Sequence, residues 1–176
     1  MQSNLVYLVE WQTEKKIVEI LKSELLCVKP GRVSVLNVVQ QLVSRTLFAS
    51  LRGQITSVLL FDTDNDGERM LRKNIEVLKT LPNVRDAVMG IPQVKNLEDE
   101  LLYSCQVKDI RELTNSRSQS DVKRDLLRLK NLAARLEKCG FSAQRLWSRN
   151  ALEEFAWIEN RANTIKLPYT VNKHIQ

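Results

Sequence analysis

The sequence predicts an α/β protein with a parallel sheet of about four strands flanked by helices, plus a C-terminal helical extension. Short β-rich apolar runs alternate with amphipathic stretches through roughly the first hundred residues, an order typical of β-α-β units. From Asn96 onward the periodic stretches have helical spacing. The length of 176 residues and the apolar content of 43% suit one core of ordinary size. We expect a first domain over residues 1–100 and a basic helical extension over residues 101–176 packed on it.

Four runs have the composition of strands, because they are apolar, rich in β-branched residues and bounded by turn signals such as VKPG and PNV. One of them, SVLLFD, is continuously apolar until its last residue, as in a strand buried on both faces. The predicted strands are LVYLVEW at 5–11, RVSVLNVV at 32–39, SVLLFD at 57–62 and RDAVMGI at 85–91.

Helical spacing of apolar residues predicts the intervening elements. In TEKKIVEILKSELL the inward face has Ile17, Ile20, Leu21 and Leu25. The other helices predicted between strands are QQLVSRTLFASLR at 40–52 and GERMLRKNIEVLKTL at 67–81. The helices predicted for the extension are NLEDELLYSC at 96–105, VKDIREL at 107–113, SDVKRDLLRLKNLAARLEKC at 120–139 and ALEEFAWIENRANTI at 151–165.

Composition excludes several classes of chemistry. The single histidine, His174, is close to the C-terminus, so a Ser-His-Asp triad or a histidine metal site is not expected. The three cysteines are far apart and predict neither a disulfide framework nor a zinc site. No apolar run has the ~20 residues of a membrane span, and MQSNLVYLVEW lacks the features of a signal peptide. We expect a soluble cytoplasmic protein whose chemistry depends on carboxylates, lysines or an oxygen-bound metal.

The positive charge is concentrated in the second half. Residues 1–100 have 13 Lys and Arg against 13 Asp and Glu, whereas residues 101–176 have 14 against 8, which accounts for the net charge of +6. A basic half beside an acidic site is suited to a polyanion such as nucleic acid. The alternative is an amphipathic helix with a solvated basic face, which the charge pattern alone favours. Its buried face would comprise Leu126, Leu127, Leu129, Leu132 and Leu136.

Acidic residues end two of the predicted strands. Glu10 ends LVYLVEW, and Asp62, Asp64 and Asp66 follow one another in LLFDTDNDG. In a parallel sheet the carboxyl ends of neighbouring strands meet at one edge, where ligands bind. Closely spaced carboxylates repel unless a cation neutralises them, and an all-oxygen site selects Mg²⁺ or Mn²⁺.

The segment DTDNDG has two other interpretations. A strand-end aspartate commonly caps a turn, which explains one such residue better than three. An EF-hand loop needs a bidentate glutamate at its twelfth position, where this chain has Lys73, and a helix before it, where this chain has an apolar strand. We therefore reject the calcium loop.

The strand-end glutamate followed some fifty residues later by DTDNDG resembles the TOPRIM domain, which has a Rossmann-like fold. Glu10, Asp62 and Asp64 match its Glu and DxD motifs, and Asp66 with Gly67 fits the longer DxDxDG form. The family's usual glycine after the glutamate is Trp11 here, while Thr13 and Glu14 stand where many members have a small residue and an acid. The resemblance covers roughly residues 4–100.

The resemblance implies a metal-dependent nuclease that hydrolyses DNA or RNA, with Glu10, Asp62 and Asp64 catalytic. It is closest in organisation to small nucleases of the overcoming-lysogenization-defect type, including anti-phage defence or toxin effectors that work beside an ATPase or a reverse transcriptase. Nucleases of this group have a late lysine that stabilises the transition state, for which Lys123 is the candidate; otherwise Lys123 contacts phosphate. The other phosphate-contacting candidates are Arg111, Arg117, Arg124 and Arg128.

Each of the remaining candidate site residues has two interpretations. Glu98 and Asp99 in NLEDEL either complete a second metal site or favour the N-terminus of a helix capped by Asn96. The aromatic residues near the C-terminus either stack on bases or close the core, and their pattern favours the core. These residues are Trp147, Phe155 and Trp157.

Two other functions compete with the nuclease. A non-catalytic TOPRIM module that binds nucleic acid or a partner protein is supported by Trp11 in place of glycine. A haloacid-dehalogenase-like phosphatase also ends a strand with DxD, but on its first strand and without a residue in the position of Glu10. We rank the nuclease first, the binding module second and the phosphatase third.

Overall fold

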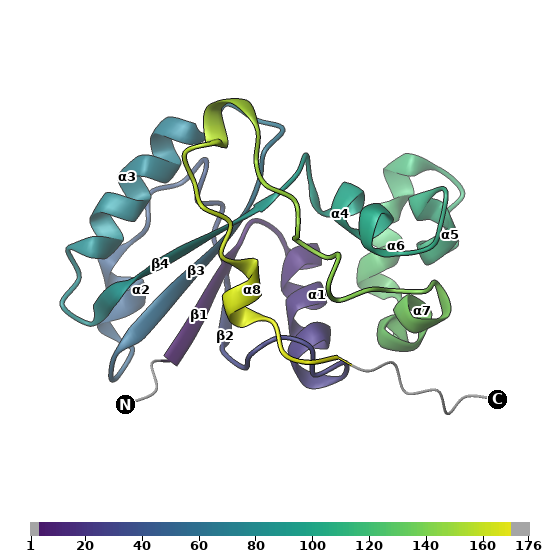
Figure 1. The fold of residues 1–176 in the computed structure, drawn as a ribbon, viewed down its shortest axis with the longest axis horizontal. Helices are drawn as coiled ribbons and strands as arrows, with labels where there is room; N and C mark the ends of the chain where they lie inside the picture. The colour runs from purple at the N-terminus through teal and green to yellow at the C-terminus, as the bar shows by residue number, and fades with distance from the viewer. Residues whose placement is uncertain (1–3, 170–176) are drawn as a thin grey trace.

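A computed structural model of the chain describes residues 4–169, although within that range the side chains of residues 85–87 are not described. Four strands form one sheet in the order β2-β1-β3-β4, and all the pairings are parallel. The predicted α/β class with a four-stranded parallel sheet flanked by helices is therefore confirmed, and the fold is consistent with a Rossmann-like one (Figure 1). The strands are β1 (Asn4–Val9), β2 (Arg32–Val35), β3 (Ile55–Asp62) and β4 (Val84–Gln93).

The helices connect and cover these strands. In the first half they are α1 (Gln12–Ser23), α2 (Arg45–Ala49) and α3 (Glu68–Lys79). In the second half they are α4 (Leu97–Ser104), α5 (Ile110–Thr114), α6 (Val122–Arg128), α7 (Leu132–Lys138) and α8 (Ala162–Ile165), with 3₁₀ turns at Gln119–Asp121 and Glu153–Phe155. Over residues 4–169 no helix has both the length and the apolarity to cross a membrane.

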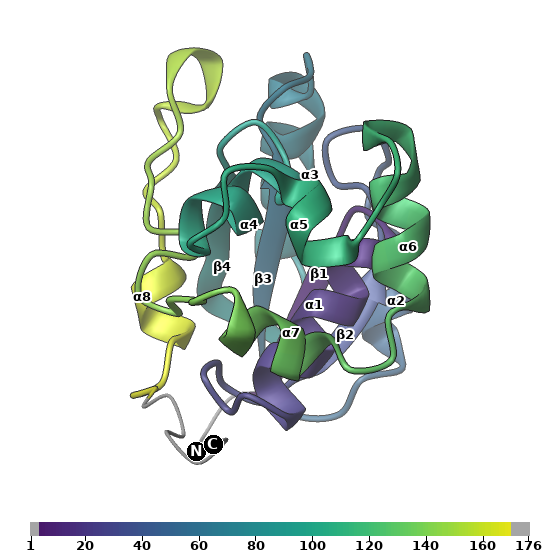
Figure 2. The ribbon, with the colours of Figure 1, turned by 90° about the vertical axis from the view of Figure 1, so that its right-hand side faces the viewer.

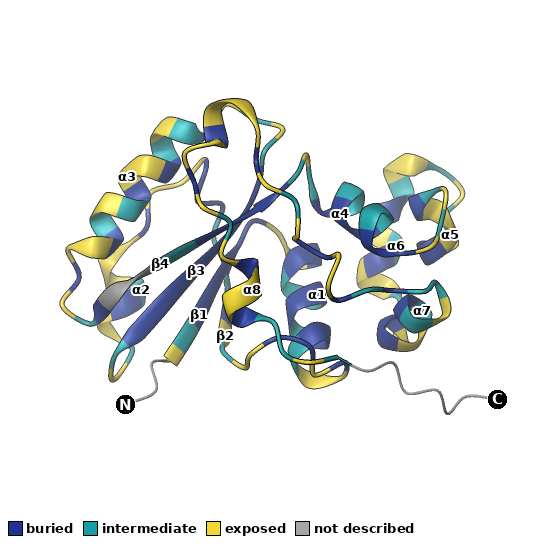
Figure 3. Cartoon of the chain, viewed as in Figure 1, coloured by how far each residue is buried: buried dark blue, intermediate teal, exposed yellow. Residues whose placement is uncertain are grey.

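The sheet lies between two helical layers. Alternate residues of β1 face opposite layers, as the two-residue period of a strand requires. Tyr7 and Val9 join the core beneath α1 and α4–α7, whereas Val6 and Leu8 join the core beneath α2 and α3. Figure 2 shows α1 and α5–α7 together on one side of the sheet and α3 on the other. Every residue of β3 is buried, which explains its continuously apolar sequence (Figure 3).

The second half of the chain packs on the first through α1. The Lys16 ammonium donates to the carbonyl oxygens of Leu126, Leu127 and Leu129 at 2.9, 2.8 and 2.6 Å. A cation at the C-terminus of α6 satisfies carbonyls that have no partner within the helix. The core beneath α1 accordingly contains residues from both proposed domains.

The prediction of one helix over 120–139 is wrong, because α6 ends at Arg128 and α7 begins at Leu132. The Lys16 contacts hold the carbonyls at the break and so stabilise a helix end there. The predicted buried face is also partly wrong: Leu127 is 44% exposed, although Leu126, Leu132 and Leu136 are buried.

The predicted helix over 151–165 is likewise absent from the described structure, which has only a 3₁₀ turn and the short α8 in that range. Asn160 forms an isolated parallel bridge with Gly90, so this segment lies along the outer edge of β4. Its side-chain amide donates to the carbonyls of Trp147 and Arg149 at 2.9 and 2.6 Å. These contacts hold the segment along the edge of β4, so tertiary pairing overrides its helical periodicity.

The predicted elements at 32–39 and 40–52 are also longer than the observed ones, since β2 ends at Val35 and α2 covers only Arg45–Ala49. The residues between them form a loop held by Asn74 of α3. Its Nδ2 donates to the carbonyls of Val38 and Gln41 at 2.6 and 2.7 Å, and its Oδ1 accepts from the Val43 amide at 2.7 Å. The backbone groups of this loop are therefore hydrogen-bonded to the buried Asn74 side chain instead of to a longer strand or helix.

Candidate functional site

The two predicted strand-end acids meet at the carboxyl edge of the sheet. Glu10 directly follows β1 and Asp62 is the last residue of β3, and these strands are neighbours. The Glu10 Oε1 accepts a hydrogen bond from the Asp62 backbone amide at 2.9 Å. Glu10 is 3% exposed and Asp62 5% exposed, so both residues are buried, and the hydrogen bonds to their carboxyl groups come from backbone and side-chain amides.

The loop after β2 supplies the second partner of Glu10. The Asn37 Nδ2 donates to Glu10 Oε2 at 3.1 Å, and Asn37 is placed by the Leu36 amide, which bonds to the Val9 carbonyl at 2.8 Å. The same loop packs against Gly67 at the start of α3. A Cβ at position 67 would lie 2.2 Å from the Cβ of Val39, so this position needs glycine for the close approach.

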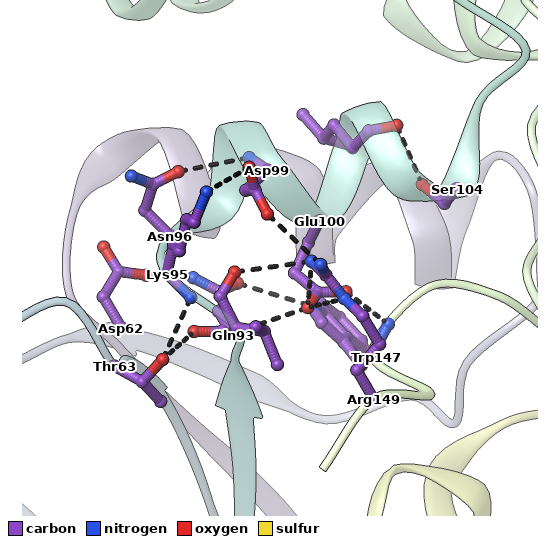
Figure 4. A network of polar contacts seen from close by, with 12 residues as sticks. Asp62, Thr63, Gln93, Lys95, Asn96, Asp99, Glu100, Ser104, Trp147 and Arg149 are labelled. Atoms are coloured by element: carbon purple, nitrogen blue, oxygen red, sulfur yellow. Dashed lines mark hydrogen bonds and ion pairs between the residues drawn. The ribbon is translucent and has the colours of Figure 1, made fainter. Parts of the chain in front are cut away.

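A chain of side-chain hydrogen bonds orients Asp62. The Trp147 indole N–H donates to Gln93 Oε1 at 3.3 Å, and Gln93 Nε2 donates to Asp62 Oδ1 at 2.6 Å. Because the indole is only a donor, the Gln93 amide must present its NH₂ group to Asp62. Figure 4 shows Gln93 between Asp62 and Trp147. Gln93 and Trp147 are fully buried, so this arrangement is rigid.

Burial raises the pKa of both strand-end acids, and repulsion from neighbouring carboxylates raises it further. Desolvation is the largest cause for Glu10 and brings its pKa to about 7, with Glu14 and Asp64 raising it further and Lys123 lowering it. Desolvation, followed by repulsion from Glu10, raises the pKa of Asp62 to about 8. At neutral pH this pair therefore retains protons that ordinary carboxyl groups have lost.

Glu14 belongs to the same cluster, although it was not among the predicted ligands. It lies in the first turn of α1, is 1% exposed, and has its pKa raised chiefly by desolvation. Its Oε2 accepts from the Thr13 hydroxyl at 3.0 Å, while its buried Oε1 has no hydrogen-bond partner. The signal that pointed to it was its place in the motif, since Glu14 stands where many members of the resembling family have an acid.

Lys123 of α6 and Glu98 of α4 extend the acidic edge of the sheet toward the second half of the chain. The Lys123 ammonium lies 3.6 Å from Glu98 Oε1, and its charge lowers the pKa of both Glu10 and Glu14. The other oxygen of Glu98, Oε2, is buried without a partner. Lys123 thus pairs with Glu98 and lowers the pKa of Glu14, and each of these two acids has a buried oxygen with no partner among the described residues. Such acceptors are few in native proteins.

The remaining predicted acids are placed differently. Asp64 is exposed and accepts from Asn96 Nδ2 at 3.2 Å, and its charge raises the pKa of Glu10 and Asp62. Asp66 is exposed on the loop before α3. Asp99 accepts from Arg149 at 3.2 Å, and Asn96 caps α4 by accepting from the Asp99 amide at 3.1 Å. The capping interpretation of NLEDEL thus holds for Asn96, and Asp99 is engaged by an arginine.

Glu100 and Arg149 form a buried ion pair behind the cluster. Glu100 is fully buried, and its Oε1 accepts from Arg149 at 2.9 and 3.2 Å. Its Oε2 accepts from the Trp147 backbone amide at 3.0 Å. This pair links α4 to the segment that positions Trp147 and hence Gln93 (Figure 4).

The donor set suits a hard divalent cation, because it consists of carboxylate oxygens and includes two buried ones without partners. In their present rotamers, however, no three His, Cys, Asp or Glu side chains of the described residues are grouped closely enough to hold a metal ion. Binding would require a rotation that brings Asp64 away from Asn96 or Glu98 toward Glu14. The fit therefore lies in the chemistry and position of the donors rather than in a preformed cage.

The predicted phosphate-contacting residues lie on or near α5 and α6, and all of them are exposed. Arg111 is held by Asp109 at 2.6 Å, and Arg124 by Asp121 at 2.8 Å and by Asp125 at 3.1 Å. Arg117 and Arg128 are exposed without an ion pair among the described residues. Lys123 alone of this set is linked to the acidic edge.

Two hollows differ in their relation to the acids. A groove of about 390 Å³ is lined by Glu98, Asp99 and Lys123 together with Gln119 and Ser120. A cavity of about 820 Å³ lies instead at the amino ends of β1 and β3, where Arg32 and Arg52 line it. The carboxylate chemistry is at the opposite ends of the strands, so the smaller groove is the one that adjoins the candidate site.

The aromatic residues near the C-terminus are largely in the core, as their pattern favoured. Trp147 and Phe155 are buried, and the Phe155 ring lies 5.5 Å from that of Phe61. Trp157 is an exception at 38% exposed, with the Arg72 guanidinium 3.8 Å above its ring. His174, to which the exclusion of histidine chemistry referred, lies outside the described residues.

Comparison of the chain with protein-family models, with curated proteins and with solved structures found no match.

Proposed function

We propose that this protein is a metal-dependent nuclease of the TOPRIM type, which hydrolyses phosphodiester bonds in DNA or RNA. The observation that carries the proposal is the burial of Glu10 and Asp62 against each other at the ends of neighbouring parallel strands. Two like charges in a desolvated site destabilise the fold, and a bound cation is a common reason for retaining them. Both groups are hydrogen-bonded by neutral amides, Asn37 on Glu10 and Gln93 on Asp62, and neither forms an ion pair within the described residues 4–169 that would give the pair a purely structural role.

In this proposal Glu10, Asp62 and Asp64 hold a Mg²⁺ or Mn²⁺ ion, with Glu14 and Glu98 as the nearest further donors. A divalent ion there would polarise the phosphoryl oxygen and lower the pKa of a bound water molecule. Gln93 keeps one oxygen of Asp62 fixed, and Asn37 does the same for Glu10. These amides therefore act as positioning residues, because they set the direction in which the remaining lone pairs point.

Lys123 is suited to stabilise negative charge that develops on the phosphate. It is a side-chain cation beside Glu98, and its field reaches both Glu10 and Glu14. Arg117 and Arg128 add unpaired positive charge on the same half of the chain, which fits a polyanionic substrate. A cytoplasmic role as an anti-phage or toxin effector, with an ATPase or a reverse transcriptase as partner, extends this proposal from the resemblance alone.

The second candidate is a TOPRIM module that binds nucleic acid or protein without cleavage. Two observations favour it. The carboxylates of the described residues do not converge in their present rotamers. Glu10 and Asp62 also accept hydrogen bonds from neutral donors. A haloacid-dehalogenase-like phosphatase ranks third, because it leaves the burial of Glu10 beside Asp62 without a role.

Cleavage of labelled single-stranded DNA, double-stranded DNA and structured RNA tests the proposal. Each substrate is incubated with Mg²⁺, with Mn²⁺ or with a chelator. We expect metal-dependent cutting of at least one substrate by the wild type and none by Glu10→Ala or Asp62→Ala. Glu76→Gln, which removes an exposed acid from the far part of α3, is the matched control and should cut normally. Substrate binding without cutting under all conditions would favour the binding module instead.

A further inference from the structure

Trp11 occupies a position that helix formation and core packing do not explain. It directly follows Glu10 and is the N-cap residue of α1, but its side chain makes no capping hydrogen bond. N-cap positions favour Ser, Thr, Asp, Asn and Gly, which satisfy the free amides of the first turn. The Trp11 side chain is also 51% exposed, so little of its apolar surface contributes to the core.

The ring of Trp11 also differs from the other aromatic rings in its environment. All four phenylalanines, Tyr7 and Trp147 are buried. Tyr103 has the Arg145 and Arg149 guanidinium groups 4.6 and 4.5 Å from its ring, and Trp157 is covered by Arg72. Among the aromatic residues that the structure describes, Trp11 is the most exposed, and it is the one adjacent in sequence to the buried acid pair.

We propose that Trp11 stacks on an unpaired nucleobase next to the scissile phosphate, so that the substrate is single-stranded nucleic acid or a strand end. This inference rests on the proposed function, because it requires a phosphodiester to bind at Glu10 and Asp62. A tryptophan one residue from the cluster is within reach of the base on a flanking nucleotide. Within a duplex both faces of that base are covered by its neighbours, whereas an unpaired base has a free face for the indole.

Charge favours a nucleic acid over an apolar protein partner at this surface. Trp11 lies in the sequence between the buried acids Glu10 and Glu14, and the Lys123 ammonium pairs with Glu98 at the same edge at 3.6 Å. A phosphate with its counter-cation matches the charges, and a flat base matches the ring. Stacking of a base on an aromatic side chain tolerates any base sequence, so this contact would select for strandedness rather than for sequence.

Binding with the bases present and absent tests the inference on the intact chain. The probes are a labelled oligothymidine strand, a strand of equal length made of abasic residues, and a blunt duplex, each with Ca²⁺ in place of Mg²⁺. We expect Trp11→Ala to weaken binding of oligothymidine by about tenfold and to leave the abasic strand unchanged. Trp11→Phe should retain most of the affinity, while Trp157→Ala, the matched control at another partly exposed tryptophan, should bind as the wild type does.

Tryptophan fluorescence gives a second readout. Oligothymidine should quench the emission of the wild type and of Trp157→Phe, whereas Trp11→Phe should lose most of the quenching. Equal affinity of wild type and Trp11→Ala for oligothymidine would overturn the inference, as would an equal loss for the oligothymidine and abasic strands or preferential binding of the duplex. The first of these results would leave the exposed ring to a protein partner, whereas the other two would show that the nucleic acid is not held through an unpaired base.

The cleavage assay separates this inference from the proposed function. Metal-dependent cutting that is equally fast in wild type and Trp11→Ala contradicts the inference and leaves the nuclease intact. Stacking at Trp11 without any cutting contradicts the nuclease and leaves a single-strand binding module. Absence of both binding and cutting contradicts both.

Discussion

Asp62→Asn should reduce metal-dependent cleavage by at least about 100-fold while making the protein more stable at pH 8. The activity falls because the amide is a poor ligand for a hard cation. The stability rises because the substitution removes one of two buried like charges and keeps an oxygen to accept the hydrogen bond from Gln93. A single change with these opposite effects is typical of residues selected for function rather than for folding.

The pH dependence of unfolding measures the second effect. Glu10 and Asp62 have pKa values of about 7 and about 8 in the folded protein, above their ordinary values of 4.5 and 3.8. Between these limits the folded state binds more protons than the unfolded chain, so the free energy of unfolding falls as pH rises from about 4 to 8. Because each pKa unit corresponds to about 1.4 kcal/mol, we expect metal-free wild type to lose several kcal/mol across this window and its Tm to fall by at least about 10 °C.

Thermal unfolding in the presence of chelator at several pH values provides the test. Asp62→Asn should lose much less stability with rising pH than the wild type does, and the exposed-acid control Glu76→Gln should follow the wild type. If the two unfolding profiles remain parallel between pH 5 and pH 8.5, Asp62 is ionised in the ordinary range and the repulsion argument fails.

Arg149→Met should destabilise the protein by about 3 kcal/mol or more, the largest stability effect that we expect of a single exchange. Its guanidinium is the cation that faces the carboxylate of Glu100, whose side chain is fully buried. Loss of the arginine leaves that charge in a desolvated site, hydrogen-bonded among the described residues by the amides of Val94 and Trp147, with Lys166 close enough to interact with it electrostatically. The cost therefore comes from the uncompensated glutamate rather than from the lost contact.

Arg145→Met is the matched control for this exchange. Both arginines lie over the Tyr103 ring at nearly equal distances, but Arg145 is exposed and is not bonded to Glu100. Denaturant unfolding should show a loss of less than about 1 kcal/mol for Arg145→Met. The double variant with Arg149→Met and Glu100→Gln should regain part of the lost stability, because it no longer has the carboxylate charge that the arginine neutralised. Equal effects of the two arginine exchanges would contradict a structural role for the ion pair.

The sequence predicts the sheet well because its strands are buried. Because β3 is buried on both faces, its sequence is a continuous apolar run that ends in an acid. The position of the strand can therefore be predicted from the sequence. Glu10 and Asp62 follow from the same rule, since parallel strand ends share an edge. The observed β3 runs from Ile55 to Asp62, against a predicted start at residue 57.

The partners of these acids could not be predicted, for a physical reason. Asn37, Gln93 and Trp147 act through hydrogen bonds across the fold, at sequence separations of 27, 31 and 54 residues. Amide and indole groups have no spacing that marks such a role. The segment at 151–165 was mispredicted for a related reason, because its pairing with the edge of β4 through Asn160 depends on contacts far apart in the chain.

Lys123 and Glu14 could be predicted in part. Lys123 was predicted by resemblance, and the structure places it 3.6 Å from Glu98 across the edge of the site. Glu14 was visible in the motif, yet its burial and its unpartnered oxygen are properties of the folded site. Local pattern therefore indicates which residues have the right chemistry, and the tertiary structure decides which of them converge.

Calorimetric titration of the protein with Mn²⁺ near pH 7 tests the central claim most directly, because it measures binding and proton release together. Repeating the titration in buffers of different ionisation enthalpy gives the number of protons displaced. The account predicts binding of Mn²⁺ with release of about one proton for each ion bound, and loss of both in Asp62→Asn. Absence of Mn²⁺ binding by the wild type, or undiminished binding by Asp62→Asn, would contradict a metal site at Glu10 and Asp62.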